Sequence, residues 1–353
     1  MIVTIAKNNV EDWDCLLLKI IPGTAGHSIG SWNVSDNGRR DYTEVNVALF
    51  NELARTRGIL RDSFRNIGFR PANTHVLALP DKLIFSISRG DIDFLVLEAD
   101  ERPVEMCELV RDIRLGKIGP NPYLVISVIT WRADNLLITN FINAGADDVI
   151  VMPASVGFAS GRVDQLIDDR REFVVTTGYV GPDRRSRSRI TIDELGTFAV
   201  PNGLRYKTTG DECAKPNSAA LKRANRIVKE HRLRRLTLRL EQLAAEGERF
   251  AAEQPGAPLP TVPLTELLDL TEDIEKRSHG ASTSVTELTA SMGSIMQAIV
   301  RESSASADMF ALLKVHGQAL LSLQRGDEDA TELVVRAVKT AKQVVEKRSQ
   351  AAS

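Results

Sequence analysis

Between residues 45 and 173, short apolar runs alternate with segments in which apolar residues recur every three or four positions. The runs span residues 47–50, 74–79, 94–97, 124–129 and 149–151. Such runs predict strands buried on both faces, and the three-to-four spacing predicts amphipathic helices between them. Because parallel neighbours need crossover connections, the alternation predicts an α/β fold with a doubly wound, five-stranded parallel sheet.

The central run, residues 94–97, ends in Glu98, and Asp100 follows two positions later. In a doubly wound parallel sheet, the ligand site lies at the carboxyl ends of the strands. The side chains that directly follow the predicted strands are those of Asn51, Glu52, Glu98, Thr130 and Met152. We therefore expect these side chains at one edge of the sheet, and any chemistry of this region among them.

The region resembles the response-regulator receiver domain, which has a flavodoxin-like fold of the chemotaxis-regulator type. The residues that carry the resemblance are Leu60-Arg61-Asp62, Leu109-Val110-Arg111-Asp112-Ile113-Arg114, Ala144-Gly145 and Pro153 after the fifth strand. Behind it, residues 173–176 and 179–185 look like a tail found after receivers in alphaproteobacterial regulators. The resemblance covers about 40% of the chain and implies a role in two-component signalling.

A working receiver, as the resemblance implies, binds Mg²⁺ with acidic residues after its first strand and accepts phosphate on an Asp of its third. A Thr or Ser hydroxyl after the fourth strand and a Lys after the fifth then contact the phosphoryl group. In this chain the corresponding residues are Asn51 and Glu52, Glu98, Thr130 and Met152. Of these only Thr130 conforms to the pattern.

The departures point in one direction. The extra methylene of Glu98 moves its carboxylate by roughly 1 Å, and misplacement of that size costs on the order of 10²-fold in an aligned displacement. The thioether of Met152 cannot supply the cation that pairs with a phosphoryl group, and Asn51 removes a charge that would neutralise a metal ion. We therefore predict a pseudo-receiver that has no cofactor, with Mg²⁺ not expected.

Alternatives remain open for individual residues. Glu98 is either a solvated carboxylate at a strand end or a fixed negative charge near Thr130 that holds one signalling conformation. Asp100 could accept phosphate in a shifted geometry. His279 could transfer phosphate, although Gly280 follows where a phosphotransfer domain has Lys. The alternative function is thus a phosphorelay component that uses Asp100 or His279.

The remainder of the chain divides by composition. Residues 1–44 form an unassigned extension, 45–175 the receiver-like domain, 176–217 a basic linker, and 218–350 a helical bundle or coiled-coil region with a Pro-rich break at 255–263. Between residues 285 and 299, apolar residues repeat by three and four, as in a short coiled-coil seam. The short loops between the last helices favour an antiparallel bundle.

The bulk composition excludes several classes of function. The chain has 45 basic and 47 acidic residues, so no overall field favours nucleic acid, and the basic helix after residue 218 lacks aromatic residues for base stacking. No apolar run is long enough for a membrane span, and no signal peptide is evident. We expect a cytoplasmic signalling protein that is not an enzyme.

The expected partners are other proteins. A histidine kinase, a chemotaxis protein or another regulatory protein would bind the receiver-like domain, and a second copy of the chain could form a homodimer. The predicted docking surface surrounds the fourth and fifth strands and includes Trp131, Val149 and Pro153, as the resemblance implies.

Overall fold

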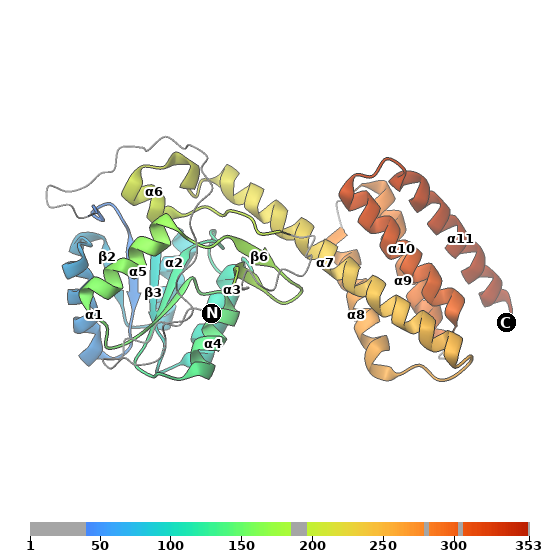
Figure 1. The fold of residues 1–353 in the computed structure, drawn as a ribbon, viewed down its shortest axis with the longest axis horizontal. Helices are drawn as coiled ribbons and strands as arrows, with labels where there is room; N and C mark the ends of the chain where they lie inside the picture. The colour runs from blue at the N-terminus through green and yellow to red at the C-terminus, as the bar shows by residue number, and fades with distance from the viewer. Residues whose placement is uncertain (1–39, 185–195, 279–281, 303–305, 352–353) are drawn as a thin grey trace, which may run out of the picture. The chain divides into compact units, whose positions relative to one another are not determined.

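The computed structural model describes residues 40–184, 196–278, 282–302 and 306–351 (Figure 1). The chain divides into two compact units, residues 1–225 and 226–353. None of the helices in the described parts combines the length and apolar character needed to cross a membrane.

The first unit contains a five-stranded parallel sheet. Its strands are β1 (Val47–Phe50), β2 (Thr74–Leu77), β3 (Phe94–Glu98), β4 (Val125–Thr130) and β5 (Asp148–Val151). They lie in the order β2-β1-β3-β4-β5, and every neighbouring pair is parallel. This is the flavodoxin-like strand order, so the predicted fold is confirmed.

Helices cover both faces of this sheet. They are α1 (Ala54–Ile67), α2 (Pro80–Arg89), α3 (Pro103–Arg114), α4 (Asn135–Ala144) and α5 (Val156–Asp168). Alternate residues of β3 serve the two faces: Leu95 and Leu97 pack in a core with α2, α3 and α4, whereas Phe94 and Val96 pack with α1 and α5. Double burial explains why these strands are continuous apolar runs rather than alternating ones.

The last helix of the sheet unit differs from its prediction. The sequence predicts a helix over residues 163–173, but α5 begins at Val156, where the Ser155 hydroxyl accepts a hydrogen bond from the Phe158 amide at 3.1 Å. Phe173 instead begins strand β6 (Phe173–Val175), which pairs antiparallel with β7 (Val180–Pro182). The apolar residues after Asp168 thus belong to a hairpin.

Much of the segment expected to be a linker packs on the sheet unit. Helix α6 (Gly203–Thr209) buries Leu204 in the α1/α5 core, and a short 3₁₀ turn, η3 (Glu212–Ala214), follows it. The Asn202 side-chain amide donates to the Leu166 carbonyl at 2.8 Å, and the Arg184 guanidinium donates to the Ala146 carbonyl at 2.7 Å. Arg185, Arg187 and Arg189 lie outside the described residues.

A buried ionic cluster anchors β6 at the amino edge of the sheet, where β4 and β5 begin. The Asp147 carboxylate is 2.8 Å from Nη2 of Arg114 and 2.8 Å from Nε of Arg170. Both guanidinium groups lie 5.2 Å from the centre of the Phe173 ring, and both donate to the Leu124 carbonyl. These polar contacts hold the hairpin together with the burial of its apolar side chains, Phe173, Val174, Val175 and Val180.

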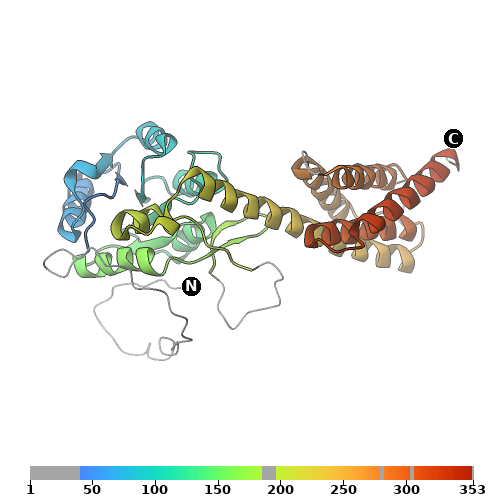
Figure 2. The same ribbon diagram turned by 90° about the horizontal axis from the view of Figure 1, so that it is seen from above.

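The second unit is helical, as predicted. Its helices are the part of α7 (Ser218–Glu253) after residue 225, then α8 (Thr261–Ser278), α9 (Thr283–Glu302), α10 (Ala307–Arg325) and α11 (Ala330–Ala351). Helices α10 and α11 lie side by side (Figures 1 and 2). Four residues of the predicted seam, Leu288, Met292, Ile295 and Ile299, are buried in one core shared by the five helices, and the first, Val285, is partly buried against it. The seam therefore packs inside the unit.

The Pro-rich break ends earlier than residue 263. Helix α8 already begins at Thr261, so Pro263 lies in its first turn. A proline is tolerated there because an amide in the first turn has no partner within the helix.

Candidate functional site

The predicted site residues gather at the carboxyl edge of the sheet. The strand register pairs Phe50 with Leu97, Glu98 with Ile129, and Thr130 with Val151. Asn51, Glu98, Thr130 and Met152 therefore end or follow four adjacent strands at nearly the same level, as in a receiver. The hydrogen bonds and ion pairs of these side chains determine what this edge can bind.

Asp100 is the centre of this arrangement. Its Oδ1 accepts a hydrogen bond from the Thr130 hydroxyl at 2.5 Å, and its Oδ2 accepts from the Trp131 backbone amide at 2.7 Å. The Thr130 hydroxyl in turn accepts from the Arg132 amide at 3.1 Å. The side chain of Asp100 is only 12% exposed. The carboxylate that contacts the Thr130 hydroxyl is thus that of Asp100, whereas one of the two alternatives for Glu98 had placed its charge near Thr130.

Glu98 is buried beside this group. Only 3% of the residue is exposed, and its Oε1 accepts from the Asp100 amide at 3.2 Å. Burial raises the pKa of Glu98 to about 7, and the nearby negative charge of Asp100 adds to the rise. A carboxyl group with this pKa is partly protonated at neutral pH, so it is neither a solvated strand-end acid nor a permanently fixed charge.

The two residues after β1 have partners of their own. The Asn51 side chain accepts from the Leu53 amide at 2.8 Å and donates to the Thr56 hydroxyl at 3.0 Å, so it closes the turn before α1. Glu52 forms an ion pair with Nε of Arg102 at 3.3 Å. The Asn51 oxygen and Oε2 of Glu52 therefore already have partners within the chain.

Two arginines that the sequence analysis did not single out complete the site. Arg102 directly precedes α3 and joins Glu52 to Glu105, and Arg132 lies 3.4 Å from the Asp100 carboxylate and also donates to the Asp100 carbonyl. Each follows a site residue by two positions, Asp100 and Thr130 respectively. A basic residue a few positions after each of two predicted strand ends was the sequence signal that could have identified Arg102 and Arg132 as site residues.

The residues predicted for a docking surface differ in their solvent exposure. Trp131 is half-buried and its indole N–H has no hydrogen-bond partner within the described residues. Pro153 is exposed and follows Met152 through a cis peptide bond. Val149 is only 9% exposed, because β5 is covered on both faces of the sheet. The prediction that Val149 contributes its side chain to a surface is therefore corrected.

The donor atoms at this edge do not fit a magnesium site. Mg²⁺ takes six oxygen ligands in a near-ideal octahedron, usually with one or two carboxylates. Here both oxygens of Asp100 accept hydrogen bonds, the Asn51 oxygen closes a turn, and Glu52 pairs with a guanidinium. Within the described ranges, no group of three or more His, Cys, Asp or Glu side chains is arranged to hold a metal ion.

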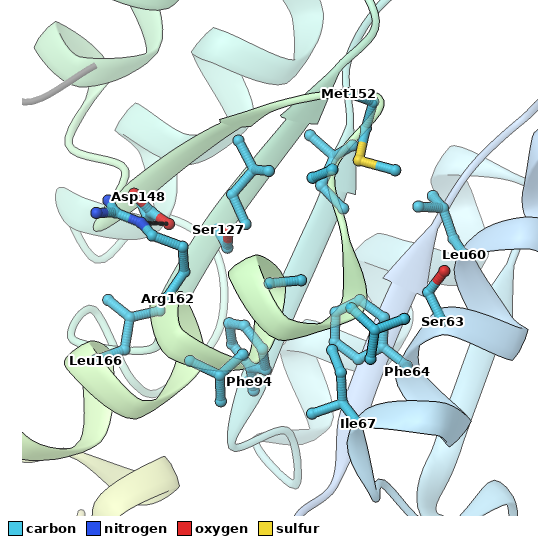
Figure 3. Close-up of a pocket in the computed structure, with 16 residues that line it drawn as sticks. Leu60, Ser63, Phe64, Ile67, Phe94, Ser127, Asp148, Met152, Arg162 and Leu166 are labelled. Carbon is cyan, nitrogen blue, oxygen red and sulfur yellow. Dashed lines mark hydrogen bonds and ion pairs between the residues drawn. The ribbon is translucent and has the colours of Figure 1, made fainter. Parts of the chain in front are cut away.

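A cavity on one face of the sheet is distinct from this edge. It lies between α1, α5 and the strands, and its apolar lining includes Phe64 and Phe94 (Figure 3). The Ser127 hydroxyl lines it and has no hydrogen-bond partner among the described residues, and Arg162 pairs there with Asp148. Its volume of about 30 Å³ is in the range of one or two water molecules, so it does not serve as a substrate pocket.

Two histidines of the helical unit, His279 and His316, bear on the phosphotransfer alternative. His279 lies outside the described residues. His316 is completely buried, with Nδ1 2.8 Å from the Leu312 carbonyl and Nε2 2.9 Å from the Ser291 hydroxyl. Burial lowers the pKa of His316, so its ring is a neutral part of the core.

Comparisons with known proteins give structural likenesses only. No protein-family model and no curated protein matches the chain. A response regulator from Thermotoga maritima is 23% identical over 35% of this chain and 99% of its own, with a TM-score of 0.31. The receiver domain of a sensor histidine kinase from Pseudomonas aeruginosa, solved with a magnesium ion in its active-site cleft, is 17% identical over 36% of this chain and 95% of its own, with a TM-score of 0.29.

A chemotaxis protein from Vibrio cholerae is 13% identical over 35% of this chain and 98% of its own, with a TM-score of 0.30. The fold assignment rests on the strand order and register of this chain, and these likenesses add no function to it.

Proposed function

We propose that this chain is a cytoplasmic signalling protein of the two-component type, in which a pseudo-receiver acts through protein contacts and not as an enzyme. The observation that carries the proposal is the hydrogen bond from the Thr130 hydroxyl to the Asp100 carboxylate. In a receiver, the resemblance implies, this hydroxyl reads an aspartyl phosphate. Here the Thr130 hydroxyl already donates a hydrogen bond to a carboxylate of the same chain, that of Asp100.

The chemistry of the remaining positions supports a site without phosphoryl transfer. A nucleophilic carboxylate must be ionised, and burial keeps Glu98 partly protonated at neutral pH. Met152 cannot neutralise a phosphoryl group, and the oxygen donors described above are committed to other partners. On this proposal the site needs neither Mg²⁺ nor any other cofactor.

The surface of the same edge supports a role in protein contact. Val104, Leu136 and Val156 stand in the first turns of α3, α4 and α5, and 69%, 69% and 39% of each residue is exposed. Together with Pro153 and the half-buried Trp131, they lie at the carboxyl edge of the sheet, the edge at which Asp100 lies. The proposed partner is a histidine kinase, a chemotaxis protein or another regulatory protein, with a second copy of this chain as the alternative.

One observation favours a second candidate function. Asp100, rather than Glu98, lies within hydrogen-bond reach of Thr130, so a phosphorelay component would use Asp100 as its acceptor, or His279 as a transfer residue. Against this, both oxygens of Asp100 accept hydrogen bonds and Arg132 lies beside them. The pseudo-receiver is therefore the preferred proposal.

Labelling with a phosphodonor separates the two. The full-length chain is incubated with ³²P-labelled acetyl phosphate and Mg²⁺, beside a receiver domain that is known to accept phosphate as the positive control. We expect no label on this chain. Stable label on Glu98 or Asp100 would overturn the pseudo-receiver, and its loss in Asp100→Asn or His279→Gln would locate the phosphorelay residue.

A further inference from the structure

We propose that Arg102 and Arg132 supply permanently the positive charge that a divalent cation supplies in a receiver, so that this edge of the sheet is independent of cations. The inference rests on the proposed function and extends it from the loss of phosphorylation to what replaced the metal ion. Its basis is the mismatch between a magnesium site and the donors present, together with the positions of the two guanidinium groups.

Three carboxyl groups meet at this edge. Because Phe50 pairs with Leu97, the residues after β1 and at the end of β3 lie side by side, which brings Glu52 to the end of the sheet where Glu98 and Asp100 lie. Glu98 and Asp100 are direct neighbours, since Oε1 of Glu98 accepts from the Asp100 amide, and like charges so placed repel one another where water is excluded. Receiver-type sites relieve such repulsion with a bound cation, whose charge is the largest in the pocket.

Arg102 neutralises the β1 side of the group. Its Nε is 3.3 Å from Glu52, and its Nη1 is 3.0 Å from Glu105 in the first turn of α3. The Glu52 side chain is 21% exposed and that of Arg102 is 45% exposed, so the pair lies at the protein surface and not in the core. One guanidinium thus connects the end of β1 to the start of α3.

Arg132 neutralises the β3 and β4 side. Its Nε is 3.4 Å from Oδ1 of Asp100, and its Nη2 donates to the Asp100 carbonyl. Its backbone amide donates to the Thr130 hydroxyl, which itself donates to Asp100. The same residue therefore balances the Asp100 charge and closes the loop that carries Trp131. Guanidinium groups stay charged at every physiological pH, so neither contact can be switched off by loss of a proton.

The test measures whether cation dependence appears when the arginines are removed. Hydrogen exchange is followed by mass spectrometry in peptides that cover residues 96–104 and 128–136 of the full-length chain. It is measured in wild type, Arg102→Gln, Arg132→Gln and the double variant, with MgCl₂ or with NaCl at equal ionic strength. Arg336→Gln, which removes an exposed guanidinium of the helical unit that pairs with Glu332, is the matched control.

In wild type and in the control, we expect exchange in both peptides to be the same in MgCl₂ and in NaCl. In the double variant we expect exchange roughly two- to tenfold faster in NaCl, and a return toward the wild-type rate in MgCl₂. Protection of the wild type by MgCl₂ would overturn the inference, since it would reveal an open cation site. A double variant that ignores MgCl₂ would overturn it as well.

These failures are distinguishable from failure of the proposed function. Phosphoryl label on the wild type refutes the pseudo-receiver, whereas a double variant that ignores MgCl₂ while the wild type takes no label refutes only the role of the arginines. Because both arginines are about half exposed, each single variant is expected to fold and to report its own half of the site.

Discussion

The two edges of the sheet use the same residue types in opposite environments. At the amino edge, the side chains of Arg114, Asp147 and Arg170 are 1%, 1% and 5% exposed. At the carboxyl edge, the arginine that pairs with Asp100 is 52% exposed and the one that pairs with Glu52 is 45% exposed. The two clusters therefore differ in solvent exposure and not in residue type.

The electrostatics follow the same division. Burial lowers the pKa of Arg114 to about 10. Burial alone would raise the pKa of Asp147, but the guanidinium groups of Arg170 and Arg114 hold it below its usual range. At the carboxyl edge, by contrast, Arg102 and Arg132 pair with Glu52 and Asp100 rather than with Glu98, and burial raises the pKa of Glu98 to about 7. The amino edge is a closed ionic cluster, and the carboxyl edge retains a group that titrates near neutral pH.

The largest expected effect comes from breaking the amino edge. Asp147→Ala leaves two buried guanidinium groups without their carboxylate, which should lower the free energy of unfolding of the sheet unit by about 3–5 kcal/mol. Chemical denaturation, followed by a probe within the sheet unit, measures it.

The matched control for this prediction is Glu332→Ala, which breaks an exposed pair with Arg336 and should cost no more than about 0.5 kcal/mol. If Asp147→Ala proved as mild as the control, the buried cluster would not be what holds the hairpin to the sheet.

A smaller and pH-dependent effect is expected from Glu98→Gln. Glu98 has its usual pKa near 4.5 when unfolded and a pKa of about 7 in the native chain, so the native state holds the proton more tightly. Its contribution to stability is fully present below about pH 4.5 and is lost as the pH rises through 7. Gln cannot ionise, so the variant should be more stable than wild type at pH 8, by about 1–3 kcal/mol, and nearly equal at pH 4.5.

Denaturation curves of wild type and Glu98→Gln across this pH range measure the difference. A constant offset between the two proteins from pH 4.5 to pH 8 would show that Glu98 does not titrate in the native state near neutral pH.

The smallest effect on stability is expected at the exposed pairs of the carboxyl edge. Arg132→Ala should lower the free energy of unfolding by less than about 1 kcal/mol, and by less still at high salt, because solvent screens the pair. Urea denaturation at two salt concentrations measures this. A loss as large as that of Asp147→Ala would remove the contrast between the two edges.

The sequence predicted the sheet because buried parallel strands leave a local mark: each apolar run, such as residues 94–97, is itself the strand. The edge position of Thr130 and Glu98 followed from the same runs. Other features have no local mark. The pairing of Asp100 with Thr130 depends on the register of two strands, and the β6–β7 hairpin depends on arginines that reach across the chain.

Val149 was wrongly predicted to lie on the surface. Its position next to the predicted docking edge suggested a surface residue, but a central position in a doubly covered strand buries its side chain. The rule that predicted the strand also excluded the side chain from the surface.

The most direct test of the account is the hydrogen-exchange rate of the Trp131 backbone amide, measured by NMR in wild type and in Asp100→Ala. Asp134→Ala is the control, since Asp134 accepts from the Leu136 amide in the same loop at 2.8 Å without touching Trp131. If Asp100 holds the loop after β4, its removal should accelerate exchange at Trp131 by roughly 10- to 100-fold, the equivalent of one charge-assisted hydrogen bond. The control should accelerate exchange at Leu136 and Leu137, whose amides both donate to Asp134, and leave Trp131 unchanged. An unprotected Trp131 amide in the wild type, or a rate unchanged by Asp100→Ala, would contradict the account.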